Sequence, residues 1–151
     1  MKKNLFDHSA IEATISRVLK LDSSSSGRWG SMNVTEMLHH CNLCNEQILE
    51  GQSVVPSRTS LKQWFVRLLS LYVVPAFPKN MKGAEENDTK NKVSGDSFET
   101  EREKFIGLML CFDQFRGAVQ ITHPAFGRLN TRQWGRAAWM HMDHHLRQFG
   151  V

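Results

Sequence analysis

The stretch NTRQWGRAAWMHMDHHLRQF, residues 130–149, decides the fold because it predicts a helix with histidines on its apolar side. Asn130 is a residue type that caps helix N-termini, so we expect the helix to span residues 131–149. On a helical wheel, His145 lies about 40° from His141, and Trp134 lies between them. The charged residues gather on the opposite side and are expected to face water: Arg136, Asp143 and Arg147.

Two further polar residues of this helix, His144 and Gln148, lie at different angles from the side that carries His141 and His145. His144 lies about 60° to the other side of His141 and is expected to flank it. Gln148 lies about 20° from His141, where it could hydrogen-bond an imidazole or a bound substrate, or face solvent at the helix end. Histidines four residues apart on one side can present two nitrogens to one metal ion, but a site needs a third ligand from elsewhere.

A second helix supplies a candidate for that third ligand. A cap at Asn33 or Thr35 opens this helix and Gly51 ends it. His40 shares its side of the helix with apolar or weakly polar residues, which indicates that it points inward: Met37, Cys44 and Ile48. His39 lies about 100° away and is expected to be exposed to solvent or to lie beside the inward side of the helix. Inward histidines are often hydrogen-bonded core residues, so this pattern alone leaves both a metal site and an ordinary core open.

The rest of the chain predicts an all-α, four-helix bundle in a single domain, residues 1–151. Helices are expected over residues 8–21 and from a capping signal at Asp96 to near Gly117. A shorter apolar helix is expected over residues 61–74, to be buried or to lie at an interface. Polar connections are expected over residues 52–60, 79–96 and 121–130, the second being the longest.

Composition narrows the class of protein. The chain has 151 residues, and its 19 Lys and Arg against 15 Asp and Glu are spread along it, so no nucleic-acid partner is expected. Three cysteines form no disulfide framework, which favours a cytoplasmic protein. The apolar stretch 64–77 is too short to span a bilayer and contains Arg67 and Pro75, so no membrane partner is expected, and a role at a membrane surface is only a minor alternative. The apolar helix at residues 61–77 is the best candidate for a homodimer interface.

Two motifs resemble a known superfamily. WGSMNVTEMLHHC, residues 29–41, and HMDHHLRQF, residues 141–149, resemble the DinB/YfiT-like proteins, and residues 122–151 resemble a branch described only as a domain of unknown function. The resemblance implies a four-helix bundle with a divalent metal, zinc or nickel. Its three histidine ligands match His40, His141 and His145, the residues that the wheel selects.

The resemblance also implies chemistry on small molecules. Relatives include transferases and isomerases that use low-molecular-weight thiols, so a thiol-dependent S-transferase or a hydrolase is the expected enzyme. Met142 stands where HExxH zinc proteases carry their glutamate, which disfavours peptidase chemistry. No catalytic residue is assigned. Glu36 and Gln148 are candidates for contacts that support the ligands, and Cys44 is either a fourth ligand or an ordinary buried residue.

Two other classes of function stay open from the sequence. One is a metal-binding protein without catalysis, such as a stress-response or interaction module. The other is a histidine-rich bundle that holds no metal and acts through protein contacts. Three imidazoles suit zinc, nickel, copper and iron, so the sequence does not select the metal.

Overall fold

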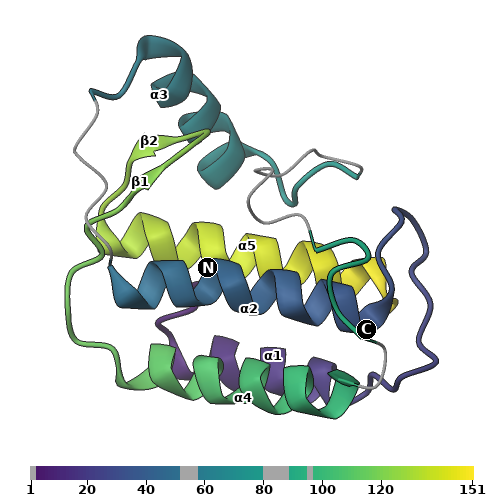
Figure 1. Cartoon of the computed structure of the whole chain (residues 1–151). Helices are drawn as coiled ribbons and strands as arrows, with labels where there is room; N and C mark the ends of the chain where they lie inside the picture. The colour runs from purple at the N-terminus through teal and green to yellow at the C-terminus, as the bar shows by residue number, and fades with distance from the viewer. Residues whose placement is uncertain (1–2, 52–57, 80–88, 95–96) are drawn as a thin grey trace.

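The computed structural model describes residues 3–51, 58–79, 89–94 and 97–151 (Figure 1). These residues form five α-helices, one π-helical turn and a small antiparallel hairpin. In chain order the elements are α1 (His8–Val18), α2 (Val34–Glu50), α3 (Leu61–Leu68), η1 (Leu69–Val73), α4 (Phe98–Gln114), β1 (Thr122–His123), β2 (Gly127–Arg128) and α5 (Thr131–Gln148).

Helices α1, α2, α4 and α5 form the predicted four-helix bundle. Helix α2 packs against α4 and α5, and α1 packs against the same two helices. Helix α3 and the hairpin lie beyond α5, on the side away from α1 and α4 (Figure 1). The largest fully buried side chains fill the bundle interior and include Ile11, Met37, Leu38, Phe105, Met109, Phe112, Met140 and Leu146.

Local signals place the ends of the two helices that carry the histidines. The side chain of Asn33 accepts a hydrogen bond from the backbone N–H of Glu36, whose carboxylate accepts one from Asn33 N–H, so α2 opens with a capping box. Asn130 and Gln133 open α5 in the same way. Helix α2 ends at Gly51, whose φ of 57° is left-handed. These boundaries confirm the sequence prediction.

Other boundaries differ from the prediction. Helix α1 ends at Val18 rather than at residue 21, because a turn at Lys20 carries Leu21 into the core. The connection 121–130 contains the two-residue strands of a hairpin. The predicted cap Asp96, like most of the long loop 79–96, lies outside the described residues.

The apolar segment after residue 60 is helical as predicted, but its expected burial is wrong for α3. No residue of α3 is buried. Its polar side chains bind the hairpin instead: Gln63 Nε2 donates to the Pro124 carbonyl at 3.0 Å, and Arg67 donates to the Arg128 carbonyl. The periodicity predicted a helix but could not show which side would face the protein. None of the described helices is both long and apolar enough to cross a bilayer.

The charged side of α5 does not face water, contrary to the wheel. Arg136 is buried and donates to the backbone carbonyls of Leu71 and Lys3 at 2.9 and 3.0 Å. Asp143 accepts hydrogen bonds from Arg17 and Arg147, both at 2.8 Å. These contacts show that the N-terminal segment, η1 and α1 cover this side of α5. The charges can be buried there because each is paired with an opposite charge or bonded to a backbone carbonyl.

Two glycines in helices give a matched test of this packing. A Cβ on Gly135 of α5 would overlap the side chains of Asn4 and Phe6, whereas one on Gly107 of α4 would meet nothing within 4 Å. We expect Gly135→Ala to lower the free energy of unfolding by about 1–3 kcal/mol. Gly107→Ala should raise it by about 0.5–1 kcal/mol, because alanine favours a helix. Urea unfolding measures both, and equal effects would contradict the close docking of the N-terminal segment.

Candidate metal centre

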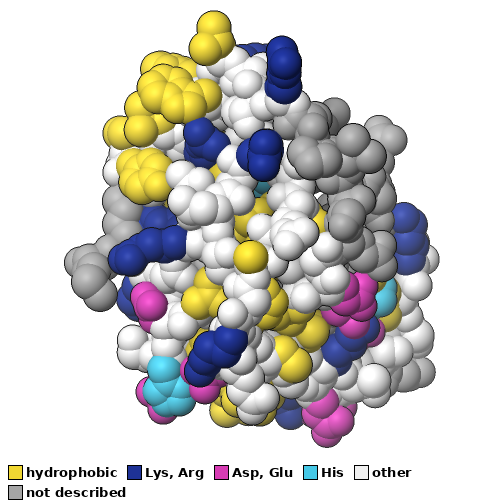
Figure 2. Space-filling view, turned by 90° about the vertical axis from the view of Figure 1, so that its left-hand side faces the viewer, with side chains coloured by type: hydrophobic (Ala, Val, Ile, Leu, Met, Phe, Trp, Pro, Cys, Tyr) yellow, Lys and Arg dark blue, Asp and Glu magenta, His cyan; other side chains and the backbone are white. Residues whose placement is uncertain are grey.

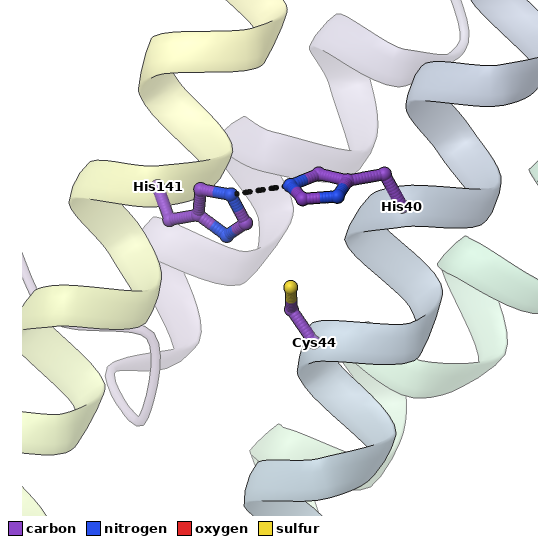
Figure 3. A group of neighbouring side chains, drawn as sticks. All are labelled: His40, Cys44 and His141. Atoms are coloured by element: carbon purple, nitrogen blue, oxygen red, sulfur yellow. Dashed lines mark hydrogen bonds between the residues drawn. The ribbon is translucent and has the colours of Figure 1, made fainter. Parts of the chain in front are cut away.

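Three histidines from two helices lie together in the bundle, with His141 next to both of the others. Nε2 of His40, on α2, lies 3.0 Å from Nε2 of His141, on α5. Nε2 of His145, one turn further along α5, lies 3.1 Å from the same atom. Figure 3 shows His40 and His141 pointing toward one another across the gap between their helices. The packing of α2 against α5 therefore brings together residues about a hundred positions apart in sequence.

Cys44 lies beside this group. It follows His40 by one turn of α2, and Figure 3 shows its side chain pointing toward the two imidazoles. The ligand atoms of His40, Cys44 and His141 all lie within 4.8 Å of one another, so these three residues could hold a metal ion. Cys44 is partly exposed rather than fully buried, so it does not match the second of the two roles that the sequence left open for it, an ordinary buried residue.

Gln148 fixes the hydrogen position on His145. Its Nε2 donates to the backbone carbonyl of Trp29 at 2.7 Å, and its Oε1 lies 2.9 Å from His145 Nδ1. A carbonyl oxygen can only accept a hydrogen bond, so the amide orientation is set by Trp29. Nδ1 of His145 must then carry the hydrogen, which leaves a lone pair on Nε2, the atom that faces the other imidazoles.

Gly30 provides the space for that contact. Its φ is 79°, in the left-handed region that favours glycine, and a Cβ there would lie 2.5 Å from Gln148 Nε2. Sequence reasoning selected Gln148 but did not assign a role to Gly30 or to the Trp29 carbonyl. The signal was present, since both residues begin the motif at residues 29–41 that suggested the superfamily.

Burial favours the neutral form of two of these imidazoles, those of His141 and His145. Burial lowers the pKa of His141 well below its usual value, and the neighbouring His145 and His40 lower it further. Burial also lowers the pKa of His145 to about 3, with His40 adding to the effect. A neutral imidazole keeps one nitrogen free to bind a metal, so burial favours the form of His141 and His145 that coordination requires.

The two short nitrogen–nitrogen contacts fit a cation better than hydrogen bonds alone. Each neutral ring carries one hydrogen, and that of His145 lies on Nδ1. If His141 Nε2 carries a hydrogen, that hydrogen can point toward only one of the two neighbouring nitrogens. If His141 Nε2 carries no hydrogen, its lone pair faces the lone pair of His145 Nε2. One cation between three lone pairs would satisfy all of them. Nitrogen ligands of a tetrahedral zinc ion lie about 3.3 Å apart, close to the separations here.

The Glu36 carboxylate accepts hydrogen bonds from the backbone of two segments. Its two carboxylate oxygens accept hydrogen bonds from the backbone N–H groups of Asn33 and Asn91, at 2.8 and 2.6 Å. Its own carbonyl accepts one from the hydroxyl of Thr89 at 2.8 Å. Glu36 therefore ties residues 89–91, which belong to the long loop, to the start of α2, and both of its carboxylate oxygens accept hydrogen bonds.

His144 and His39 lie on either side of the group. The flanking His144 is buried, and its ring contacts Trp29 and His145 edge-on at centroid distances of 5.9 and 5.1 Å. His39 points away from the other imidazoles, and its Nδ1 lies 3.0 Å from a carboxylate oxygen of Glu101. Among the seven histidines, the structure thus separates the converging three from their sequence neighbours.

The neutral histidines should make the metal-free protein sensitive to acid. The pKa of His145 is about 3 when folded and about 6.5 when unfolded, so between these values the unfolded chain binds an extra proton. We expect the free energy of unfolding to fall between pH 7 and pH 5, by at most about 1.4 kcal/mol per pH unit for each such histidine. Urea unfolding at several pH values measures this. A His145→Asn variant should show a shallower dependence, and a wild-type profile that is flat or rises toward pH 5 would contradict the assignment.

One protein family matches almost the whole chain. The family described as "Protein of unknown function (DUF1569)" matches residues 1–150, almost the whole chain. No curated protein and no solved structure matches the chain. The matched region includes both histidine-bearing helices and the loop that supplies Trp29 and Gly30. The chain therefore belongs to the DUF1569 family.

Proposed function

We propose that this chain is a divalent-metal protein of the DinB/YfiT-like superfamily that holds one ion through Nε2 of His40, His141 and His145. The observation that supports it is that Nε2 of His40 and Nε2 of His145 lie 3.0 and 3.1 Å from Nε2 of His141. The hydrogen bond from His145 Nδ1 to Gln148 adds support, because metal-binding histidines commonly donate their other N–H to such an acceptor.

Cys44 decides whether the site is open or closed. Three imidazoles leave a tetrahedral ion one position for a substrate, as in catalytic zinc sites. A Cys44 thiolate in that position would give a closed set typical of structural sites. Because Cys44 is partly exposed and next to the histidines, it lies where an incoming small molecule would also have to approach.

The function that this site supports best is a metal-dependent transferase acting on small molecules, with a low-molecular-weight thiol as the candidate substrate. A bound ion would supply Lewis acidity and stabilise an anionic thiol or oxygen ligand. Two carboxylates near the ligands in sequence are already committed: Glu36 binds backbone N–H groups, and Asp143 pairs with Arg17 and Arg147. Transfer of a thiol, which needs no carboxylate base, therefore fits better than hydrolysis of a peptide.

A metal-binding protein without catalysis is the second candidate. The contact between Cys44 and the two imidazoles favours it, because a four-ligand set leaves no place for a substrate. The two candidates differ in whether the metal-loaded protein converts a substrate and in whether Cys44 binds the ion.

Metal content tests the site itself. Protein prepared without a nickel column should contain one divalent ion per chain by elemental analysis, and His40→Ala or His145→Ala should lose it. Gln148→Leu should weaken metal affinity by about 10–100-fold, because His145 loses the acceptor that fixes its tautomer. Gln148→Glu, which retains an acceptor, should bind more tightly than Gln148→Leu.

The matched control for these variants is His39→Ala, which removes the adjacent histidine on α2 and its contact with Glu101. It should keep full metal occupancy. Equal occupancy in wild type, His40→Ala and His145→Ala would contradict the three-histidine site, and so would loss of metal only with Cys44→Ser.

Turnover tests the proposed enzyme. Metal-loaded protein should conjugate small thiols to electrophiles faster than chelated protein, and His145→Ala should match the chelated sample. Cys44→Ser should retain activity if the fourth position is open. Full metal occupancy with no turnover across thiol–electrophile pairs and activated esters would instead favour the non-catalytic candidate.

A further inference from the structure

An apolar stripe runs along the outer side of α3 and η1, far from the metal centre. Its members recur at steps of three and one residues, so they share one side of the helix. All are at least a third exposed, from Leu69 at 37% to Leu61 at 88%. The outer stripe consists of Leu61, Trp64, Phe65, Leu68, Leu69, Tyr72 and Val73. Figure 2 shows hydrophobic side chains gathered at the top of the molecule, where α3 lies.

The helix is held in this orientation by its polar side chains. Gln63 and Arg67 donate to carbonyls of the hairpin region. Tyr72 belongs to the stripe and is about half exposed, but its hydroxyl lies 3.1 Å from Gln133 Nε2 of α5. An amphipathic helix on a soluble domain normally turns its apolar side inward. The inward side carries these bonded polar groups together with the apolar Val66 and Leu71, which pack against the core, so turning the stripe inward would break both kinds of contact.

The exposed apolar surface is large for a protein that acts alone. Seven side chains at these exposures leave on the order of 800 Å², more than the 300–600 Å² that the largest patch of a typical monomer covers. Such a surface indicates a binding partner.

Among the described residues, the charged side chains that adjoin the outer stripe in sequence are positive. Neither residues 51–84 nor residues 114–142 contain an aspartate or glutamate. Four exposed cations belong to α3, the hairpin and the adjoining residues: Arg58, Lys62, Arg128 and Arg132. In Figure 2, lysine and arginine side chains lie beside the hydrophobic patch, while the acidic side chains lie in the lower half of the view. The partner should therefore be anionic.

We propose that the outer stripe docks on an anionic lipid bilayer surface, with α3 and η1 lying in the plane of the headgroups. Tryptophan, tyrosine, phenylalanine and leucine on one side, bordered by lysine and arginine, are typical of helices that bind membrane interfaces. A second copy of the chain fits less well, because a two-fold contact through the stripe would bring the same cations together. Surface docking needs no spanning helix, which removes the ground on which the sequence disfavoured a membrane.

Vesicle binding tests this proposal on the full chain. Cosedimentation with vesicles of phosphatidylcholine mixed with phosphatidylglycerol should show partition at least about tenfold stronger than with phosphatidylcholine alone, and high salt should weaken it. Lys62→Glu should reduce binding to the anionic vesicles by about fivefold or more. Trp64→Ser combined with Phe65→Ser should abolish it.

A matched control is Leu110→Ser on α4, which removes an apolar side chain that is 50% exposed, like Trp64, but lies outside the outer stripe. It should bind vesicles as wild type does, and circular dichroism should show all variants folded. The proposal would be overturned by no binding to anionic vesicles, or by an equal loss of binding with Leu110→Ser. A chain that sediments as a dimer until Trp64 and Phe65 are replaced would also overturn it and assign the stripe to self-association.

Discussion

The packing of α2 against α5 is the constraint on which the site depends. It places Nε2 of His40 3.0 Å from Nε2 of His141, two atoms that belong to helices at opposite ends of the chain. Capping boxes at Asn33 and Asn130 fix where each helix begins, and so fix the turn at which each histidine enters the interior. A shift of one residue in either helix would rotate its imidazole by about 100° and separate the nitrogens.

The loop before α2 completes this arrangement from the other side. The Trp29 carbonyl orients Gln148, Gln148 orients His145, and Gly30 leaves the space in which the amide lies. Burial then favours the neutral form of His141 and His145. The motif at residues 29–41 thus contributes a ligand candidate, His40, and also the support for a second one on α5. This explains physically why the two motifs occur together in the chain.

Sequence reasoning predicted the bundle and the inward histidines because both follow from helical periodicity and capping residues. It could not predict which side of α3 faces the protein, since that depends on hydrogen bonds from Gln63 and Arg67 to a hairpin distant in sequence. It also expected Arg136 and Asp143 to face water, because periodicity does not show that backbone carbonyls and arginines cover them. The approach of Cys44 to the histidines depends on side-chain geometry, so the sequence left its role open.

The central claim is that three imidazole nitrogens, fixed by helix packing and by Gln148, form one metal site. X-ray absorption spectroscopy of the zinc-loaded protein tests it most directly, because the method counts imidazole and sulfur ligands separately. The account predicts three imidazoles with nitrogen at about 2.0–2.1 Å from the ion. Two imidazoles with a sulfur at about 2.3 Å, the set of His40, His141 and Cys44, would contradict it.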